Sequence, residues 1–110
     1  MHLPQEGSLL RVFIAEADRY QGKALYEVIV LKARELGLAG ATVLRGIMGF
    51  GADSRVHSAK ILELSNDLPL VIEIVDAEEN LARIMPFLDE AVKDGLITQE
   101  KVRVIKYRSR

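Results

Sequence analysis

The sequence predicts one α+β domain whose elements follow the order strand, helix, strand, strand, helix, strand. Short β-prone runs such as Leu9–Ala17 and Leu70–Val75 alternate with segments of helical periodicity. The chain has 110 residues, of which 49% are hydrophobic and 28% charged, enough for a single globular core. We therefore expect residues 9–110 to form the domain and residues 1–8 to be a flexible N-terminal tail.

Charge and composition exclude several classes of function. The formal net charge is -1, which gives no reason to expect a nucleic-acid partner. The chain has no cysteine, so disulfides, thiolate metal sites and cysteine nucleophiles are excluded. The first residues do not read as a signal peptide, and no apolar run approaches the roughly 18 residues of a membrane span. These features predict a cytoplasmic protein without direct membrane insertion.

The first half of the chain predicts a strand, a helix and a second strand. Leu9–Ala17 is apolar and β-prone, and Asp18 with Gln21 three residues later matches a capping box at a helix start. The helix places Leu25, Ile29, Ala33 and Leu36 on one face and is expected to stop at Gly37. Ala41–Phe50 is the second strand candidate.

The second half repeats this order. Ala59–Leu64 and Leu70–Val75 predict one interrupted strand or two short strands, with the break near Pro69. Asp76 and Glu79 form a second capping-box signal. The apolar positions of the helix that follows are Leu81, Ile84, Met85, Leu88 and Val92, with its end expected at Gly95 and a kink expected at Pro86. Lys101–Tyr107 alternates as a last strand.

Two such halves predict a ferredoxin-like βαββαβ plait. In that fold a four-stranded antiparallel sheet carries both helices on one face. The other face must then meet water or another subunit, and the apolar content of the strands favours association.

The sequence offers no catalytic constellation. His2 lies in the N-terminal tail and His57 in a loop, and neither has a local partner that indicates a triad. The adjacent acids Glu78 and Glu79 belong to a first helical turn, where the helix dipole favours negative charge, and Asp89 and Glu90 suit a solvated helix face. We therefore expect a protein that is not an enzyme.

The segment from Gly49 to Lys60 is the predicted functional loop. Gly49, Phe50 and Gly51 follow a strand, where glycine lets backbone N–H groups approach an anion. The alternative is that these glycines only permit a tight turn. The cationic side chains that could accompany an anion are Arg45, Arg55, Lys60, Lys101 and Arg103.

The sequence also resembles a known family. The run LYEVIVLKARELGLAGATVLRGIMGFG at 25–51 is similar to the signature of the uncharacterised PII-like proteins, relatives of the PII signalling proteins. Gly49-Phe50-Gly51 followed by His57 resembles the KGFG…H segment of PII, and LVIEIV at 70–75 resembles its third strand. The resemblance covers Leu9 to Tyr107.

The resemblance implies a homotrimeric regulator that binds an adenine nucleotide or an anion between subunits, with no other cofactor. Residues 50–60 would correspond to the T-loop, which engages a protein or membrane-transporter target. By position, the resemblance implies ligand-binding roles for Gly51, Gly95 and Lys101. Together with the candidates from the glycine and charge pattern, the predicted ligand-binding residues are Arg45, Gly49, Gly51, Gly95, Lys101 and Arg103, and the predicted target-engaging residues of the 50–60 segment are Asp53, Arg55, His57 and Lys60.

One departure from PII bears on the ligand. Where the PII phosphate loop reads GKIGDGK, residues 95–101 read GLITQEK, so Thr98 and Glu100 replace two glycines. This difference favours a smaller nucleotide or another anion over ATP bound in the PII manner. Two alternatives stay open: a CutA-type metal-binding trimer that uses Asp53 and His57, and a dimeric α+β barrel enzyme.

Overall fold

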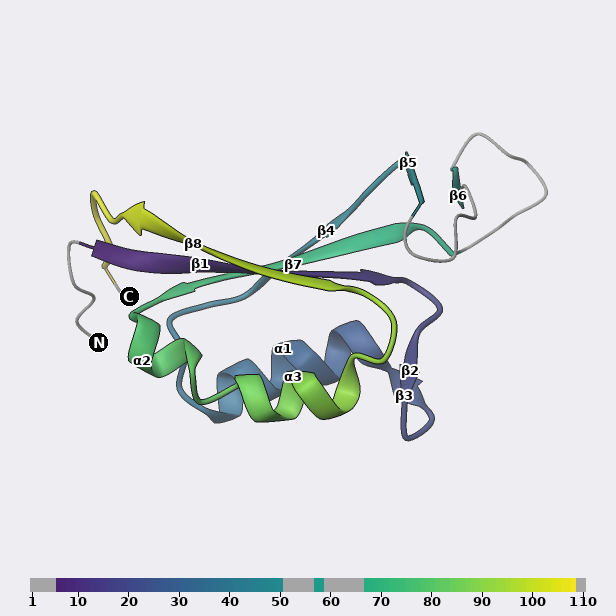
Figure 1. Ribbon diagram of the computed structural model, residues 1–110, viewed down its shortest axis with the longest axis horizontal. Helices are drawn as coiled ribbons and strands as arrows, with labels where there is room; N and C mark the ends of the chain where they lie inside the picture. The colour runs from purple at the N-terminus through teal and green to yellow at the C-terminus, as the bar shows by residue number, and fades with distance from the viewer. Residues whose placement is uncertain (1–5, 51–56, 59–66, 109–110) are drawn as a thin grey trace.

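The computed structural model describes residues 6–50, 57–58 and 67–108 and contains the predicted four-stranded sheet (Figure 1). The strand order is β4-β7-β1-β8, and every neighbouring pair is antiparallel. The α+β, ferredoxin-like class is therefore confirmed. The four strands are β1 (Glu6–Ala15), β4 (Thr42–Arg45), β7 (Pro69–Asp76) and β8 (Leu96–Arg103).

The helices all lie on one face of this sheet (Figure 1). They are α1 (Leu25–Glu35), α2 (Glu78–Leu81) and α3 (Met85–Ala91). Two small hairpins project from the end of the sheet where β1 finishes, namely β2 (Arg19–Tyr20) with β3 (Lys23–Ala24) and β5 (Met48–Gly49) with β6 (His57–Ser58). Within the described residues, no helix is long and apolar enough to cross a membrane.

The core lies between the helices and the two central strands. Alternate residues of β1 and β7 face the helices and are buried, which is the two-residue period of a half-buried strand. They pack against apolar side chains of α1, α2 and α3. Burying one side chain of this size stabilises the fold by about 1.5–3 kcal/mol. The buried strand residues are Leu10, Val12, Ile14, Leu70, Ile72 and Ile74.

The first helix begins later than the capping-box signal predicts. Asp18 does not cap a helix, because its Oδ2 accepts a hydrogen bond from the Ala15 N–H at 3.0 Å. Gln21 and Gly22 both have positive φ, 49° and 81°, the combination that a two-residue type I′ hairpin turn requires. The β2–β3 hairpin therefore occupies the predicted first turns, and α1 starts at Leu25.

The predicted second helix is two helices. Asp76 precedes the N-cap residue Ala77, and its side chain receives bonds from the Ala77 N–H and the Asn80 amide rather than forming a capping box with Glu79. Helix α2 ends at Leu81, and α3 carries Pro86 in its first turn, where the missing N–H has no helical partner to lose. The backbone becomes extended at Val92, before Gly95.

Strand boundaries also differ from the sequence-based expectation. The strand predicted at Leu70–Val75 is confirmed within β7, and β1 begins at Glu6 rather than Leu9. The strand predicted at 41–50 narrows to β4, and the last strand ends at Arg103 instead of Tyr107. Residues 59–64 lie outside the described residues.

Candidate functional site

Three of the predicted ligand-binding residues lie at one end of the sheet. At this end β1 finishes opposite the start of β7, because Ala15 pairs with Pro69. Arg45 ends β4, Gly49 lies in the adjoining β5, and Gly95 immediately precedes β8. Arg45, Gly49 and Gly95 therefore belong to segments at the same end of the sheet, although Arg45 and Gly95 adjoin its two opposite edge strands, β4 and β8. The β5–β6 hairpin projects from this end (Figure 1).

Short polar contacts hold this sheet end together. The Gly46 N–H donates to the Pro69 carbonyl at 2.7 Å, and the Glu16 N–H donates to the Leu68 carbonyl at 2.9 Å. Arg45 forms an ion pair with Glu16 through its Nη2 atom. The Arg45 side chain is still 60% exposed, so the guanidinium remains accessible from solvent while Glu16 orients it.

Glycines 46 and 49 are explained first by packing. A Cβ atom at Gly46 would lie 2.9 Å from Pro69 Cγ, and one at Gly49 would lie 3.2 Å from the same atom. Both distances are shorter than ordinary van der Waals contacts. Close packing against Pro69 is therefore a structural reason for glycine at positions 46 and 49. Gly51 lies outside the described residues.

Gly95 allows the chain entering β8 to approach β1 closely. A Cβ atom there would lie 2.5 Å from the Phe13 carbonyl oxygen and 3.1 Å from Val92 Cγ1. Any other residue would push the start of β8 away from β1. Gly95 is thus placed beside the first ladder pair, Phe13 with Leu96, at the end of the sheet that carries Arg45.

Lys101 and Arg103 lie toward the other end of the sheet. Lys101 pairs with Ser8 and Arg103 pairs with Glu6, at the start of β1. The segment that the sequence aligned with the PII phosphate loop is therefore mostly the regular strand β8. Both cationic side chains are exposed. One copy of the chain does not bring them together with Arg45 and Gly49.

The remaining predicted residues belong to the sequence segment 50–60. Asp53, Arg55 and Lys60 lie outside the described residues, and for His57 the structure describes only the backbone, which pairs with Gly49. Among the residues that are described, no three His, Cys, Asp or Glu side chains could hold a metal ion together. The metal hypothesis built on Asp53 and His57 is consequently not tested.

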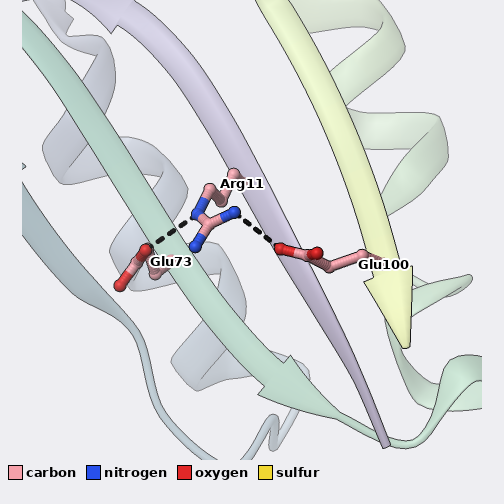
Figure 2. A network of polar contacts seen from close by, with 3 residues as sticks. All are labelled: Arg11, Glu73 and Glu100. Atoms are coloured by element: carbon pink, nitrogen blue, oxygen red, sulfur yellow. Dashed lines mark hydrogen bonds and ion pairs between the residues drawn. The ribbon is translucent and has the colours of Figure 1, made fainter. Parts of the chain in front are cut away.

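The sheet face opposite the helices carries a network that sequence reasoning missed. Arg11 on β1 lies between two carboxylates, donating from Nε to Glu73 Oε2 at 2.9 Å and from Nη1 to Glu100 Oε1 at 2.7 Å (Figure 2). The hydrogen bond to Glu73 is the main cause that raises the pKa of Arg11; burial opposes it and the charge of Glu100 adds to it. The sequence gives one sign of this network: a single charged residue, Arg11, within the otherwise apolar run of β1.

This uncovered face is banded, because residues directly paired across strands share a side of the sheet. One row is apolar, and it consists of Leu44, Val71, Phe13 and Leu96. The next row is polar, and it consists of Thr42, Glu73, Arg11 and Thr98. The third row consists of Val75, Leu9 and Glu100, in which Leu9 pairs with Val75 on one side and with Glu100 on the other. Leu44 and Leu96 are 48% and 56% exposed.

Solved structures with this architecture define the class of fold. The chain matches CPII, a nitrogen regulatory PII-like protein from Thiomonas intermedia K12 solved with ADP, AMP and bicarbonate, with a TM-score of 0.64 and 16% identity over 92% of this chain and 90% of that one. It also matches a protein from Thermus thermophilus described as PII-like and signalling, with a TM-score of 0.66 and 18% identity over 91% and 90% of the two chains. The fold is thus PII-like.

The sequence then places the chain in a family. Residues 7–104 match the family model DUF190, described as Uncharacterized ACR, so the chain belongs to that family. It is 42% identical over 99 residues to a UPF0166 protein of Aquifex aeolicus strain VF5, covering 88% of this chain and 91% of the relative. It is 37% identical over 102 residues to the UPF0166 protein MJ1524 of Methanocaldococcus jannaschii, covering 92% and 94%.

Proposed function

We propose that this protein is a cytoplasmic, non-catalytic regulator of the PII-like kind. It binds a small effector, an adenine nucleotide or an anion such as bicarbonate, in clefts between the subunits of a homotrimer. It engages a protein target, such as a membrane transporter, through residues 50–60. The observation that carries the proposal is the fold shared over nine-tenths of both chains with CPII, which was solved with ADP, AMP and bicarbonate.

The positions of the cations support a site between copies. Strand β8 rises about 3.3 Å per residue, so Lys101 lies ~17 Å along the strand from Leu96, which adjoins Gly95. One phosphate group cannot contact residues at both places within a single chain. A second copy that brings its Lys101 and Arg103 toward the first copy's Arg45 and Gly49 would complete a cationic cleft.

The placement of Glu100 removes an electrostatic objection to such a ligand. Glu100 turns toward Arg11 on the uncovered face, whereas the adjacent Lys101 points to the opposite side of the strand. Its carboxylate therefore lies with a guanidinium rather than beside a phosphate held by Lys101. Thr98 and Glu100 keep this segment a strand that does not wrap a triphosphate, which favours ADP, AMP or a small anion over ATP.

A thermal-shift experiment tests the proposal with ADP, AMP, ATP and bicarbonate. A ligand at 100 times its dissociation constant stabilises the folded state by about 2.7 kcal/mol, or a midpoint rise of roughly 10 °C for a chain of this size. Lys101→Ala removes a charge-assisted hydrogen bond and is expected to weaken nucleotide binding about 10-fold or more. Lys23→Ala, on the β3 strand of the small hairpin, is the matched control and should bind as the wild type does.

The proposal is contradicted if the wild-type protein is folded and trimeric but none of the four ligands changes its melting temperature. An equal loss of binding in both lysine variants would also contradict the assignment of Lys101, because it would indicate a non-specific charge effect.

A further inference from the structure

The Arg11 network lies in the middle of the uncovered sheet face, between two apolar regions. On one side is the row of Leu44, Val71, Phe13 and Leu96, and on the other are Leu9 and Val75. Neighbouring rows on one face are two residues apart along a strand, or ~7 Å. A partner that covers both apolar regions must therefore also cover Arg11, Glu73 and Glu100.

Covering this network removes charges from water. A charge that loses water is tolerated only when paired and hydrogen-bonded, and an unpaired one is strongly destabilising. The side chains of Arg11, Glu73 and Glu100 are 36%, 30% and 57% exposed, so the network is still partly hydrated in the single chain. An apolar partner surface would strip that water without replacing its hydrogen bonds.

The network presents both signs of charge, which makes the face complementary to another copy of itself. A guanidinium has five N–H donors, and the contacts within the chain use Nε and Nη1 (Figure 2). Each carboxylate has two oxygens, and only one oxygen of Glu73 and one of Glu100 accept from Arg11. Donors and acceptors thus remain for a facing network.

We propose that the Arg11–Glu73–Glu100 network is the selectivity element of self-association: the networks of different copies contact one another, so that the face accepts this chain and rejects apolar surfaces. The inference rests on the proposed assembly and adds to it the residues that choose the partner. The flanking apolar rows supply the buried area, while the ion network determines which surface can supply the matching hydrogen bonds.

Charge reversal with mixing tests this role. Arg11→Glu leaves three carboxylates on the face, and the double variant Glu73→Lys, Glu100→Lys leaves three cations. Each variant is expected to stay monomeric in sedimentation velocity at a concentration where the wild type assembles. Mixing the two should restore an assembly that contains both chains, distinguished by a mass tag. Arg34→Glu, on the exposed surface of α1, is the control and should assemble as the wild type does.

If mixing the two variants restores the assembly, the networks of different copies contact one another. If the network acts only within one chain, mixing restores nothing. Two variants that each lack their internal ion pairs cannot repair them by mixing unless the networks of different copies meet. Folded variants that assemble alone, or that stay monomeric when mixed, overturn the inference. A wild-type protein that is itself monomeric overturns the proposed assembly as well, so the two failures are distinguishable.

A milder variant keeps the test decisive if a reversed chain does not fold. Arg11→Lys conserves the charge but cannot donate to two carboxylates in the fixed geometry of a guanidinium. It is expected to raise the dissociation constant of the assembly about 10-fold, with circular dichroism confirming the fold. An unchanged dissociation constant overturns the inference.

Discussion

Gly95→Ala tests whether glycine is needed at this position for the close packing of β8 against β1. The added Cβ would lie 2.5 Å from the Phe13 carbonyl oxygen, whereas ordinary contact begins at 3.4 Å, so the two strands must separate by 0.9 Å (3.4 minus 2.5). The oxygen belongs to the backbone and cannot rotate away. The substitution therefore acts on the β1–β8 ladder at its first pair.

The expected cost follows from that displacement. Losing one or two ladder hydrogen bonds costs about 0.5–1.5 kcal/mol each, and overpacking adds about 1–3 kcal/mol. The φ of Gly95 is +159°, which alanine rarely adopts, so the usual gain from restricting the unfolded chain is not expected here. The net destabilisation is about 2–3 kcal/mol, which lowers the urea midpoint by about 1–2 M.

Gly40→Ala is the matched control for this measurement. A Cβ atom at Gly40 would meet no heavy atom within 4 Å, so this variant should equal the wild type or exceed it slightly in stability. Urea unfolding at one protein concentration, followed by circular dichroism, gives both midpoints. A Gly95→Ala midpoint equal to that of the wild type would refute the packing argument and leave ligand approach as the reason for glycine.

Two further predictions concern buried and half-buried side chains. Asp76→Ala should lower the free energy of unfolding by about 3 kcal/mol, because the Ala39 N–H, the Ala77 N–H and the Asn80 amide lose their acceptor. Asp76→Asn keeps one acceptor oxygen and should lower the free energy of unfolding by about half as much. Equal urea midpoints for the two variants would contradict this explanation. Burial, followed by the charge of Glu90, raises the pKa of Tyr20 above its ordinary value of 10.0. The neutral phenol therefore contributes stability that is present below about pH 10 and is lost as the pH rises toward the folded-state pKa. Absorbance titration of the tyrosinate should show this late midpoint and a lower one in Glu90→Gln, whereas a Tyr20 midpoint at or below 10 would contradict the assignment.

The hydrophobic periodicity of the sequence predicted the helices and strands that bury one face and expose the other. The alternation of β7 places Leu70, Ile72 and Ile74 in the core, and the same pattern is readable in its sequence. Strand β8 was misplaced because it is an edge strand whose exposed residues do not alternate in polarity, although its backbone pairs with β1 from Glu6 to Phe13. Its register depends on pairing that the local sequence does not encode.

Local signals failed where two local structures compete for the same residues. Asp18 and Gln21 satisfy a capping-box spacing, but Gln21 and Gly22 also fit a type I′ turn, and the turn is what forms. Pro86 predicted a disturbance in the second helix, and the chain resolves it by starting a separate helix, α3, one residue earlier.

The site was harder to predict because its parts are distant in sequence. Arg11 is 62 residues from Glu73 and 89 residues from Glu100, so only the sheet order shows that they meet. The register of β8 on β1 places Lys101 beside Ser8, whereas Gly49 adjoins Pro69 at the other end of β1, although both residues were assigned to one ligand on sequence grounds. Contacts between strands therefore determine which candidate residues can act together.

A crystal structure determined with ADP and bicarbonate tests the central claim most directly. We expect a trimer with one nucleotide between each pair of copies, its phosphates near Lys101 of one chain and near Arg45 and Gly49 of the other. Empty clefts at saturating ADP and bicarbonate, or a nucleotide held within a single copy away from these residues, would contradict the proposed function.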